Sequence, residues 1–149
     1  MKVLLVEDDE NKRKNLRECL LEIVPNISLD QAGSLQTGLR ALRENTPELI
    51  ILDMTLPNYE PGPDEPGGQP HLFGGREFLR QMDRYDIVIP VIVVTQFSAF
   101  GSGKHAKDLV GLDAELRSEH EAVYRGAIHY NSAVLGWKDE LKAKIGSLS

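Results

Sequence analysis

The stretch LIILDMTLP, residues 49–57, decides the fold, because four apolar residues in a row end at a single carboxylate. An unbroken apolar run of this length is typical of a strand buried on both faces, as in the middle of a parallel sheet. Asp53 follows the run directly, so it lies where the strand leaves the core. Ligands of open α/β sheets bind in the crevice outside the carboxyl ends of the strands. Asp53 is therefore a candidate site residue, although it could also cap the strand and begin the turn toward Pro57.

Strand and helix signals alternate along the rest of the chain. Apolar runs or alternations predict further strands within residues 3–6, 27–29, 91–94 and 124–130. Apolar residues at spacings of three and four predict helices within residues 10–24, 35–42, 78–82, about 107–121 and 134–145. This order predicts one α/β domain over residues 1–149, in which a parallel sheet carries helices on both faces.

The bulk composition argues against several classes of protein. A net charge of −6 and the lack of a basic run disfavour direct nucleic-acid binding. No stretch is long enough to span a membrane, and the N-terminal apolar run is too short for a signal peptide. Cys19 is the only cysteine, so an internal disulfide is impossible and a cytoplasmic location is expected. The helical apolar pattern around Cys19 predicts a small core residue rather than a reactive thiol.

Residues 58–74 interrupt the regular pattern. They are dense in proline and glycine, which excludes regular structure, and they are long for a simple connection. We interpret them as a surface loop beside Asp53. The loop could be a lid, an interaction loop or a tolerated insertion.

Chemically useful groups follow three of the predicted strands. Glu7 and Asp8 follow the first strand, Asp53 follows the third, and Thr95 ends the fourth. The carboxyl ends of parallel strands share one edge, so these groups should converge if the strands are neighbours. Clustered carboxylates repel one another, and Mg²⁺, which prefers oxygen ligands, would relieve that repulsion. Asp53 would then be a nucleophile toward phosphorus, and Thr95 could donate a hydrogen bond to a phosphoryl oxygen.

These motifs resemble the receiver domain of two-component response regulators. The matching pieces are VLLVEDD at 3–9, LIILDMTLP at 49–57 and PVIVVT at 90–95, with AGS at 32–34 and GREFL at 75–79. The resemblance implies a flavodoxin-like fold with strand order 2-1-3-4-5 and Asp53 as the phospho-acceptor. It also implies that Mg²⁺ is bound by Asp8 and Asp53, by Glu7 through water and by the Thr55 backbone carbonyl. Thr95 would follow the phosphoryl group and couple it to a surface change.

The chain departs from the family pattern after residue 95. The family has a lysine at the end of the fifth strand, but residues 124–132 contain none. The spacing beyond Thr95 implies a second insertion between residues 96 and 123, and Gln96 replaces a small residue. The aromatic switch residue of the last strand could be either Tyr124 or Tyr130, since the register is open.

Three residues could replace the missing lysine. Lys104 or Lys107 could reach in from the loop after Thr95, and His129 could point into the crevice from the last strand. The plainer interpretation is that both lysines are solvated and that His129 packs or hydrogen-bonds within its strand. Phosphorylation would then be supported by the metal, and the usual signal relay would be altered.

Three functional hypotheses follow. The first is a signalling module that accepts a phosphoryl group on Asp53 from a histidine kinase or phosphotransfer protein and acts on a downstream protein. The second is an atypical receiver that docks proteins without phosphorylation. The third, a phosphohydrolase, ranks below both because such enzymes usually need a second acid where Thr55 stands. The first hypothesis allows at most self-phosphorylation and autodephosphorylation as enzymatic activity, and these residues include no output domain.

Overall fold

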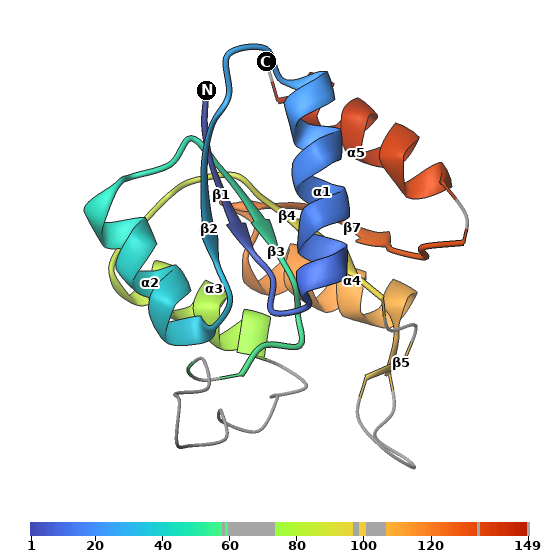
Figure 1. Cartoon of the computed structure of the whole chain (residues 1–149). Helices are drawn as coiled ribbons and strands as arrows, with labels where there is room; N and C mark the ends of the chain where they lie inside the picture. The colour runs from blue at the N-terminus through green and yellow to red at the C-terminus, as the bar shows by residue number, and fades with distance from the viewer. Residues whose placement is uncertain (58, 60–73, 97–98, 101–106, 134, 149) are drawn as a thin grey trace, which may run out of the picture.

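The computed structural model describes residues 1–57, 59, 74–96, 99–100, 107–133 and 135–148. Five parallel strands form one sheet in the order β2-β1-β3-β4-β7, which confirms the expected strand order and the flavodoxin-like fold (Figure 1). The strands are β1 (Lys2–Val6), β2 (Ser28–Ala32), β3 (Leu49–Leu52), β4 (Val91–Thr95) and β7 (Tyr124–His129). The helices are α1 (Glu10–Ile23), α2 (Leu35–Glu44), α3 (Gly74–Arg84), α4 (Leu109–Glu119) and α5 (Gly136–Gly146).

The sheet separates two apolar cores. Helices α2, α3 and α4 cover one face, and α1 and α5 cover the other (Figure 1). Side chains alternate between the faces along β3, where Ile50 and Leu52 pack in the first core and Leu49 and Ile51 in the second. None of these four residues is more than 1% exposed. The apolar run at residues 49–52 therefore forms a strand that is buried on both faces, as the sequence predicted.

Two helices that begin at the edge formed by the carboxyl ends of the strands are capped by side chains. The Asp9 carboxylate accepts hydrogen bonds from the backbone N–H groups of Asn11 and Lys12 and so fixes the first turn of α1. Ser34 caps α2 in a reciprocal capping box with Thr37. These caps fix where each helix leaves the edge at which β1 and β2 end.

An irregularity in β7 explains why its register could not be read from the sequence. Val91 pairs with Tyr124 but Val93 pairs with Ala127, so β7 carries one extra residue there. Gly126 has a φ of +124°, which favours glycine. The extra residue moves later side chains to the opposite face, so Tyr124 lies in the core beneath α4 and Tyr130 in the core beneath α1 and α5.

The segment after β4 contains a short hairpin that the sequence did not predict. Strands β5 (Ala99–Phe100) and β6 (Lys107–Asp108) pair antiparallel. Strands of two residues are too short to give a periodic signal, so the sequence shows only a loop pattern there. The Pro/Gly-rich segment at 58–74 lies outside the described residues apart from Tyr59 and Gly74. Among the helices described, none combines the length and apolarity needed to cross a membrane.

Candidate phosphorylation site

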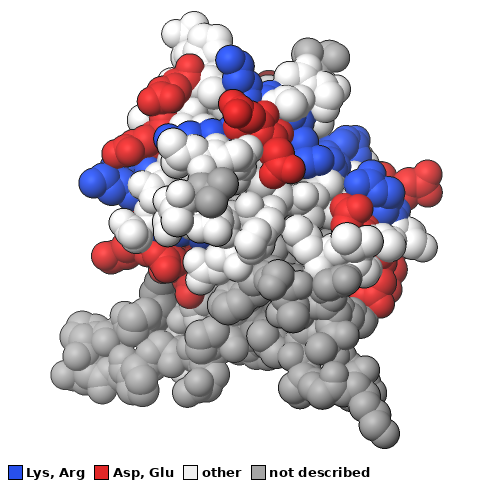
Figure 2. All heavy atoms as spheres, turned by 90° about the vertical axis from the view of Figure 1, so that its right-hand side faces the viewer, with Lys and Arg blue, Asp and Glu red and all other residues white. Residues whose placement is uncertain are grey.

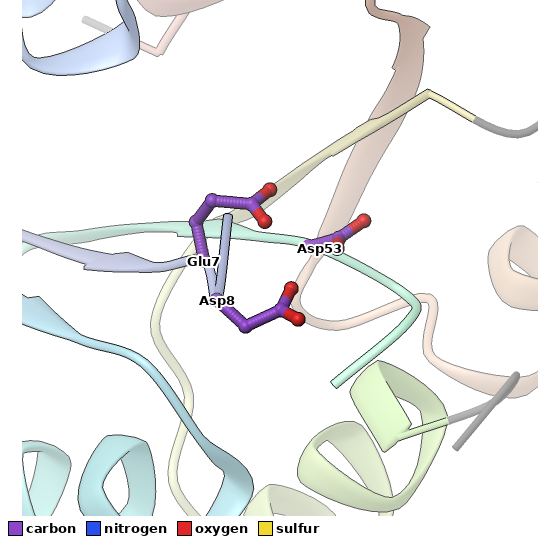
Figure 3. A group of neighbouring side chains, drawn as sticks. All are labelled: Glu7, Asp8 and Asp53. Atoms are coloured by element: carbon purple, nitrogen blue, oxygen red, sulfur yellow. The ribbon is translucent and has the colours of Figure 1, made fainter. Parts of the chain in front are cut away.

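Three carboxylates gather at the carboxyl edge of the sheet, as the strand order required. Glu7 and Asp8 follow β1 and Asp53 follows β3, and one oxygen from each lies within 4.8 Å of the others (Figure 3). Glu7 is 1% and Asp53 4% exposed, whereas Asp8 lies nearer the solvent. The Asp53 N–H donates to the Val6 carbonyl at 3.0 Å, which ties the ends of β1 and β3 together.

A buried lysine lies among these carboxylates. Lys12, on the first turn of α1, is 2% exposed, and its Nζ forms an ion pair with Oε1 of Glu7. The same Nζ lies 3.3 Å from Oδ1 of Asp53 and donates a hydrogen bond to the Val94 carbonyl at 2.7 Å. Lys12 therefore contacts the ends of β1, β3 and β4 at once.

Burial dominates the electrostatics of the site. It raises the pKa of Glu7 to about 8, although the nearby Lys12 ammonium opposes the change. Burial also raises the pKa of Asp53, against the charge and hydrogen bond of Lys12 and the hydrogen bond from the Thr55 backbone N–H. In both cases the desolvation of a buried carboxylate outweighs the opposing charge of the one ammonium that the two groups share.

Two threonine hydroxyls complete the edge. Thr95 is fully buried at the end of β4, and its Oγ1 has no hydrogen-bond partner among the residues that the structure describes. The Oγ1 of Thr55, two residues after Asp53, is likewise buried and unpaired within the described part of the chain. A buried hydroxyl without a partner is costly, so a ligand that accepts a hydrogen bond from Thr95 would stabilise this edge.

The donor set fits a divalent cation of the hard type. With all three carboxylates ionised, they leave a formal charge of −2 against the one ammonium, and one divalent ion would balance it. No ion pair joins Asp8 to another described residue, so its carboxylate is open to a metal. Oxygen ligands of this kind are those that Mg²⁺ takes in proteins.

Of the three candidate replacements for the missing lysine, only the side chain of His129 is described by the structure. Lys104 lies outside the described residues, as does the side chain of Lys107. His129 is exposed, and its Nε2 lies 3.2 Å from the Gln96 carbonyl, which agrees with a histidine bonded beside its own strand. Among the residues that the structure describes, the cation at the site is Lys12, which the strand-end motifs do not include.

A sequence signal for Lys12 did exist. Leu16, Cys19, Leu20 and Ile23 define the apolar face of α1, and Lys12 precedes Leu16 by four residues. Residues four apart lie on one face of a helix, so the pattern predicts a lysine directed at the sheet. A lysine on a buried helix face next to an acidic cluster is a candidate site residue.

The architecture and the acidic edge together define a receiver domain, and comparison with known families agrees. The family model of the response regulator receiver domain matches residues 3–115. The chain therefore belongs to the response-regulator receiver family of two-component signalling. Proteins of this family bind Mg²⁺ at an acidic pocket and interact with histidine kinases or phosphotransfer proteins and with downstream partners.

Two relatives span nearly the whole chain. A protein of Sinorhizobium fredii, "Uncharacterized protein y4jR", is 42% identical over 144 residues, which are 95% of each chain. The "Detocs response regulatory protein DtcB" of Enterobacter cloacae is 30% identical over 99% of this chain and 100% of its own length. The similarity therefore extends beyond residue 115, where the family match ends.

Solved structures support the fold. A two-component response regulator of the LuxR family from Aurantimonas sp. is 22% identical with a TM-score of 0.62, covering 99% of this chain and 83% of its own. The Mn(2+)-bound form of response regulator Rcp1 is 18% identical with a TM-score of 0.61, covering 95% and 89% of the two chains.

Proposed function

We propose that the protein is a phosphate-accepting signalling module that takes a phosphoryl group on Asp53 from a histidine kinase or phosphotransfer protein in a Mg²⁺-dependent reaction. The observation that carries the proposal is the convergence of Glu7, Asp8 and Asp53 within 4.8 Å at the sheet edge where Thr95 ends β4, its hydroxyl having no partner among the described residues. A nucleophile, oxygen ligands for a cation and a hydrogen-bond donor thus meet at one edge.

The chemistry is a direct displacement at phosphorus. An Asp53 oxygen attacks phosphorus, a new P–O bond forms, and the bond to the leaving group breaks with its electron pair going to that group. The leaving group is acetate from acetyl phosphate, or the imidazole of a phosphohistidine, which then holds a proton. Asp8, Asp53 and the Thr55 carbonyl would hold Mg²⁺, with Glu7 acting through water. Bound Mg²⁺ neutralises charge on the transferred group.

Thr95 provides the other contact to the phosphoryl group. Its hydroxyl ends the strand beside β3 and would donate a hydrogen bond to a phosphoryl oxygen. Any enzymatic activity would be limited to self-phosphorylation and autodephosphorylation. The cytoplasmic location also stays a prediction.

Surface charge bears on the class of partner. On the face shown in Figure 2, basic and acidic side chains are interspersed around a largely uncharged centre. A mixed surface of this kind suits protein partners better than a nucleic-acid backbone, which favours a continuous basic track. The expectation that the chain binds no nucleic acid directly stays a prediction.

Intact-mass analysis tests the proposal. The protein is incubated with acetyl phosphate, with and without Mg²⁺, beside an Asp53→Asn control. The mass should rise by one phosphoryl group only when both Asp53 and Mg²⁺ are present. No gain in mass under any of these conditions would reject phosphate acceptance.

Docking without phosphorylation is the second candidate function. Lys12 already forms ion pairs with Glu7 and Asp53, so the site is partly neutralised before any phosphoryl group arrives. If the protein is a docking module, the wild type and the Asp53→Asn variant should bind the partner with equal affinity. Comparing partner capture by these two proteins, with and without phosphodonor, separates the two functions.

A further inference from the structure

We propose that Lys12 is the cationic group of the phosphorylation site, pairing with Asp53 before transfer and with a phosphoryl oxygen after it. This inference rests on the proposed function. The ammonium lies 3.3 Å from Oδ1 of Asp53, so it is in contact with the group that reacts. No other ion pair to Asp53 occurs among the residues that the structure describes.

The burial of Lys12 indicates that the fold holds its ammonium in a fixed place at the site. A lysine that is 2% exposed loses its hydration and is stable only when its ammonium is paired and hydrogen-bonded. The polar partners of Nζ lie at the site edge, namely Glu7, Asp53 and the Val94 carbonyl. The neighbouring Arg13 instead donates to the Glu7 backbone carbonyl, at 3.1 Å.

Phosphoryl transfer changes the charge that faces Lys12. The Asp53 carboxylate carries one negative charge, whereas an acyl phosphate at the same residue carries two on its phosphoryl oxygens. The site therefore gains one negative charge beside an ammonium that already contacts a carboxylate oxygen of Asp53. A charge-assisted hydrogen bond to a phosphoryl oxygen would offset that gain.

Movement of Lys12 toward a phosphoryl group would change side-chain contacts on the face of the sheet that α1 and α5 cover. Its Nζ lies 5.6 Å from the centre of the Tyr130 ring, whose hydroxyl accepts a hydrogen bond from Asn15 at 2.8 Å. Tyr130 packs against Trp137 with ring centres 5.1 Å apart. A signal carried by Lys12 would thus reach α1 and α5 through Tyr130.

The test compares Lys12→Met with Lys14→Met. Lys14 is exposed on the same helix, so the control removes the same charge without touching the site. Mg²⁺ binding is measured by calorimetry, and the rate of phosphorylation by acetyl phosphate at saturating Mg²⁺ is measured by intact mass. Lys12→Gln replaces Lys12→Met if circular dichroism shows that the methionine variant does not fold.

Opposite effects are expected in the two assays. Removing the ammonium should tighten Mg²⁺ binding by about tenfold, because the remaining carboxylates lose their competing cation. It should slow phosphorylation by about tenfold or more, because the phosphoryl oxygens lose a partner. A variant whose site is only structurally disrupted would lose both Mg²⁺ binding and phosphorylation. Opposite changes in the two assays therefore separate a role in the site from a structural role.

The refuting outcomes are distinct. If Lys12→Met is phosphorylated as fast as Lys14→Met, the role of Lys12 is wrong while the proposed function stands. If Lys12→Met loses Mg²⁺ binding together with phosphorylation, Lys12 supports the structure only and the inference is again wrong. If the wild-type protein gains no phosphoryl group, the proposed function fails and the role of Lys12 fails with it.

Discussion

Gly75 provides a quantitative test of how the site is held. It lies in the first turn of α3, where the helix approaches the backbone that follows β3. A Cβ added at Gly75 would lie 2.3 Å from the Asp53 carbonyl oxygen and 2.8 Å from the Met54 Cα. Both are backbone atoms and cannot rotate away. Gly75→Ala must therefore push α3 and the Asp53 segment apart.

The size of the effect follows from these distances. Restoring ordinary contact from 2.3 Å requires a displacement of roughly 1 Å, and α3 buries Phe78, Leu79 and Met82 completely. The Gly75 N–H also donates to the Met54 carbonyl at 2.9 Å and would be pulled from it. Overpacking of this kind costs about 1–3 kcal/mol, and we expect ~2–3 kcal/mol here. For a chain of this length, that loss lowers Tm by roughly 5–10 °C.

Urea unfolding measures the loss, and Gly136→Ala is the matched control. Gly136 begins α5, and a Cβ there would meet nothing within 4 Å. Alanine in a helix is favoured over glycine by up to about 1 kcal/mol, so the control should be neutral or stabilised. The rate of Asp53 phosphorylation should also fall in Gly75→Ala, because the displaced backbone carries the nucleophile. A Gly75→Ala midpoint equal to that of Gly136→Ala would refute this account of the α3 contact.

Three further predictions concern β7, α1 and α5. Gly126→Ala should lower the free energy of unfolding by about 1–2 kcal/mol, because a φ of +124° is strained for any residue other than glycine. Urea unfolding measures the loss, and an unchanged midpoint would contradict the prediction. Burial raises the pKa of the Cys19 thiol, so its thiolate forms at higher pH than in the unfolded chain. A thiol reagent at pH 8 should therefore label the native protein at least about tenfold more slowly than the urea-unfolded protein, and equal rates would show that the thiol is accessible. Phosphodonor with Mg²⁺ should change the fluorescence of Trp137, the single tryptophan, because Lys12 would leave the Tyr130 ring against which Trp137 packs; Asp53→Asn should show no change.

The sheet could be predicted because its central strands carry an unambiguous pattern. Runs such as LIIL at 49–52 and VIVVT at 91–95 are buried on both faces, so their hydrophobicity shows no alternation that could be misassigned. The last strand could be located but not its register, because the extra residue at Gly126 shifts the alternation midway. Hairpin β5–β6 gave no signal, since two residues per strand are too few to establish a period.

The acidic part of the site followed from the same rule that gave the fold. Once β1, β3 and β4 are parallel neighbours, Glu7, Asp8, Asp53 and Thr95 must meet at their carboxyl ends. Lys12 escaped that rule because it comes from a helix rather than from a strand end. Lysines are almost always exposed, which makes solvation the default interpretation of any lysine in a sequence.

The sequence left both Tyr124 and Tyr130 as candidates for the aromatic switch residue. The position of Lys12 on α1 distinguishes between them. Tyr124 lies on the other face of the sheet, where its hydroxyl donates to Asp113 of α4 at 2.5 Å. Tyr130 lies beside the ammonium of Lys12 and is held by Asn15 of the same helix. A change at Asp53 that moves Lys12 therefore has a direct physical route to Tyr130, while Tyr124 stays with α4. If Lys12 carries the response, α1 and α5 are the elements whose surface should change, and partners that read the phosphorylated state should be sought there first.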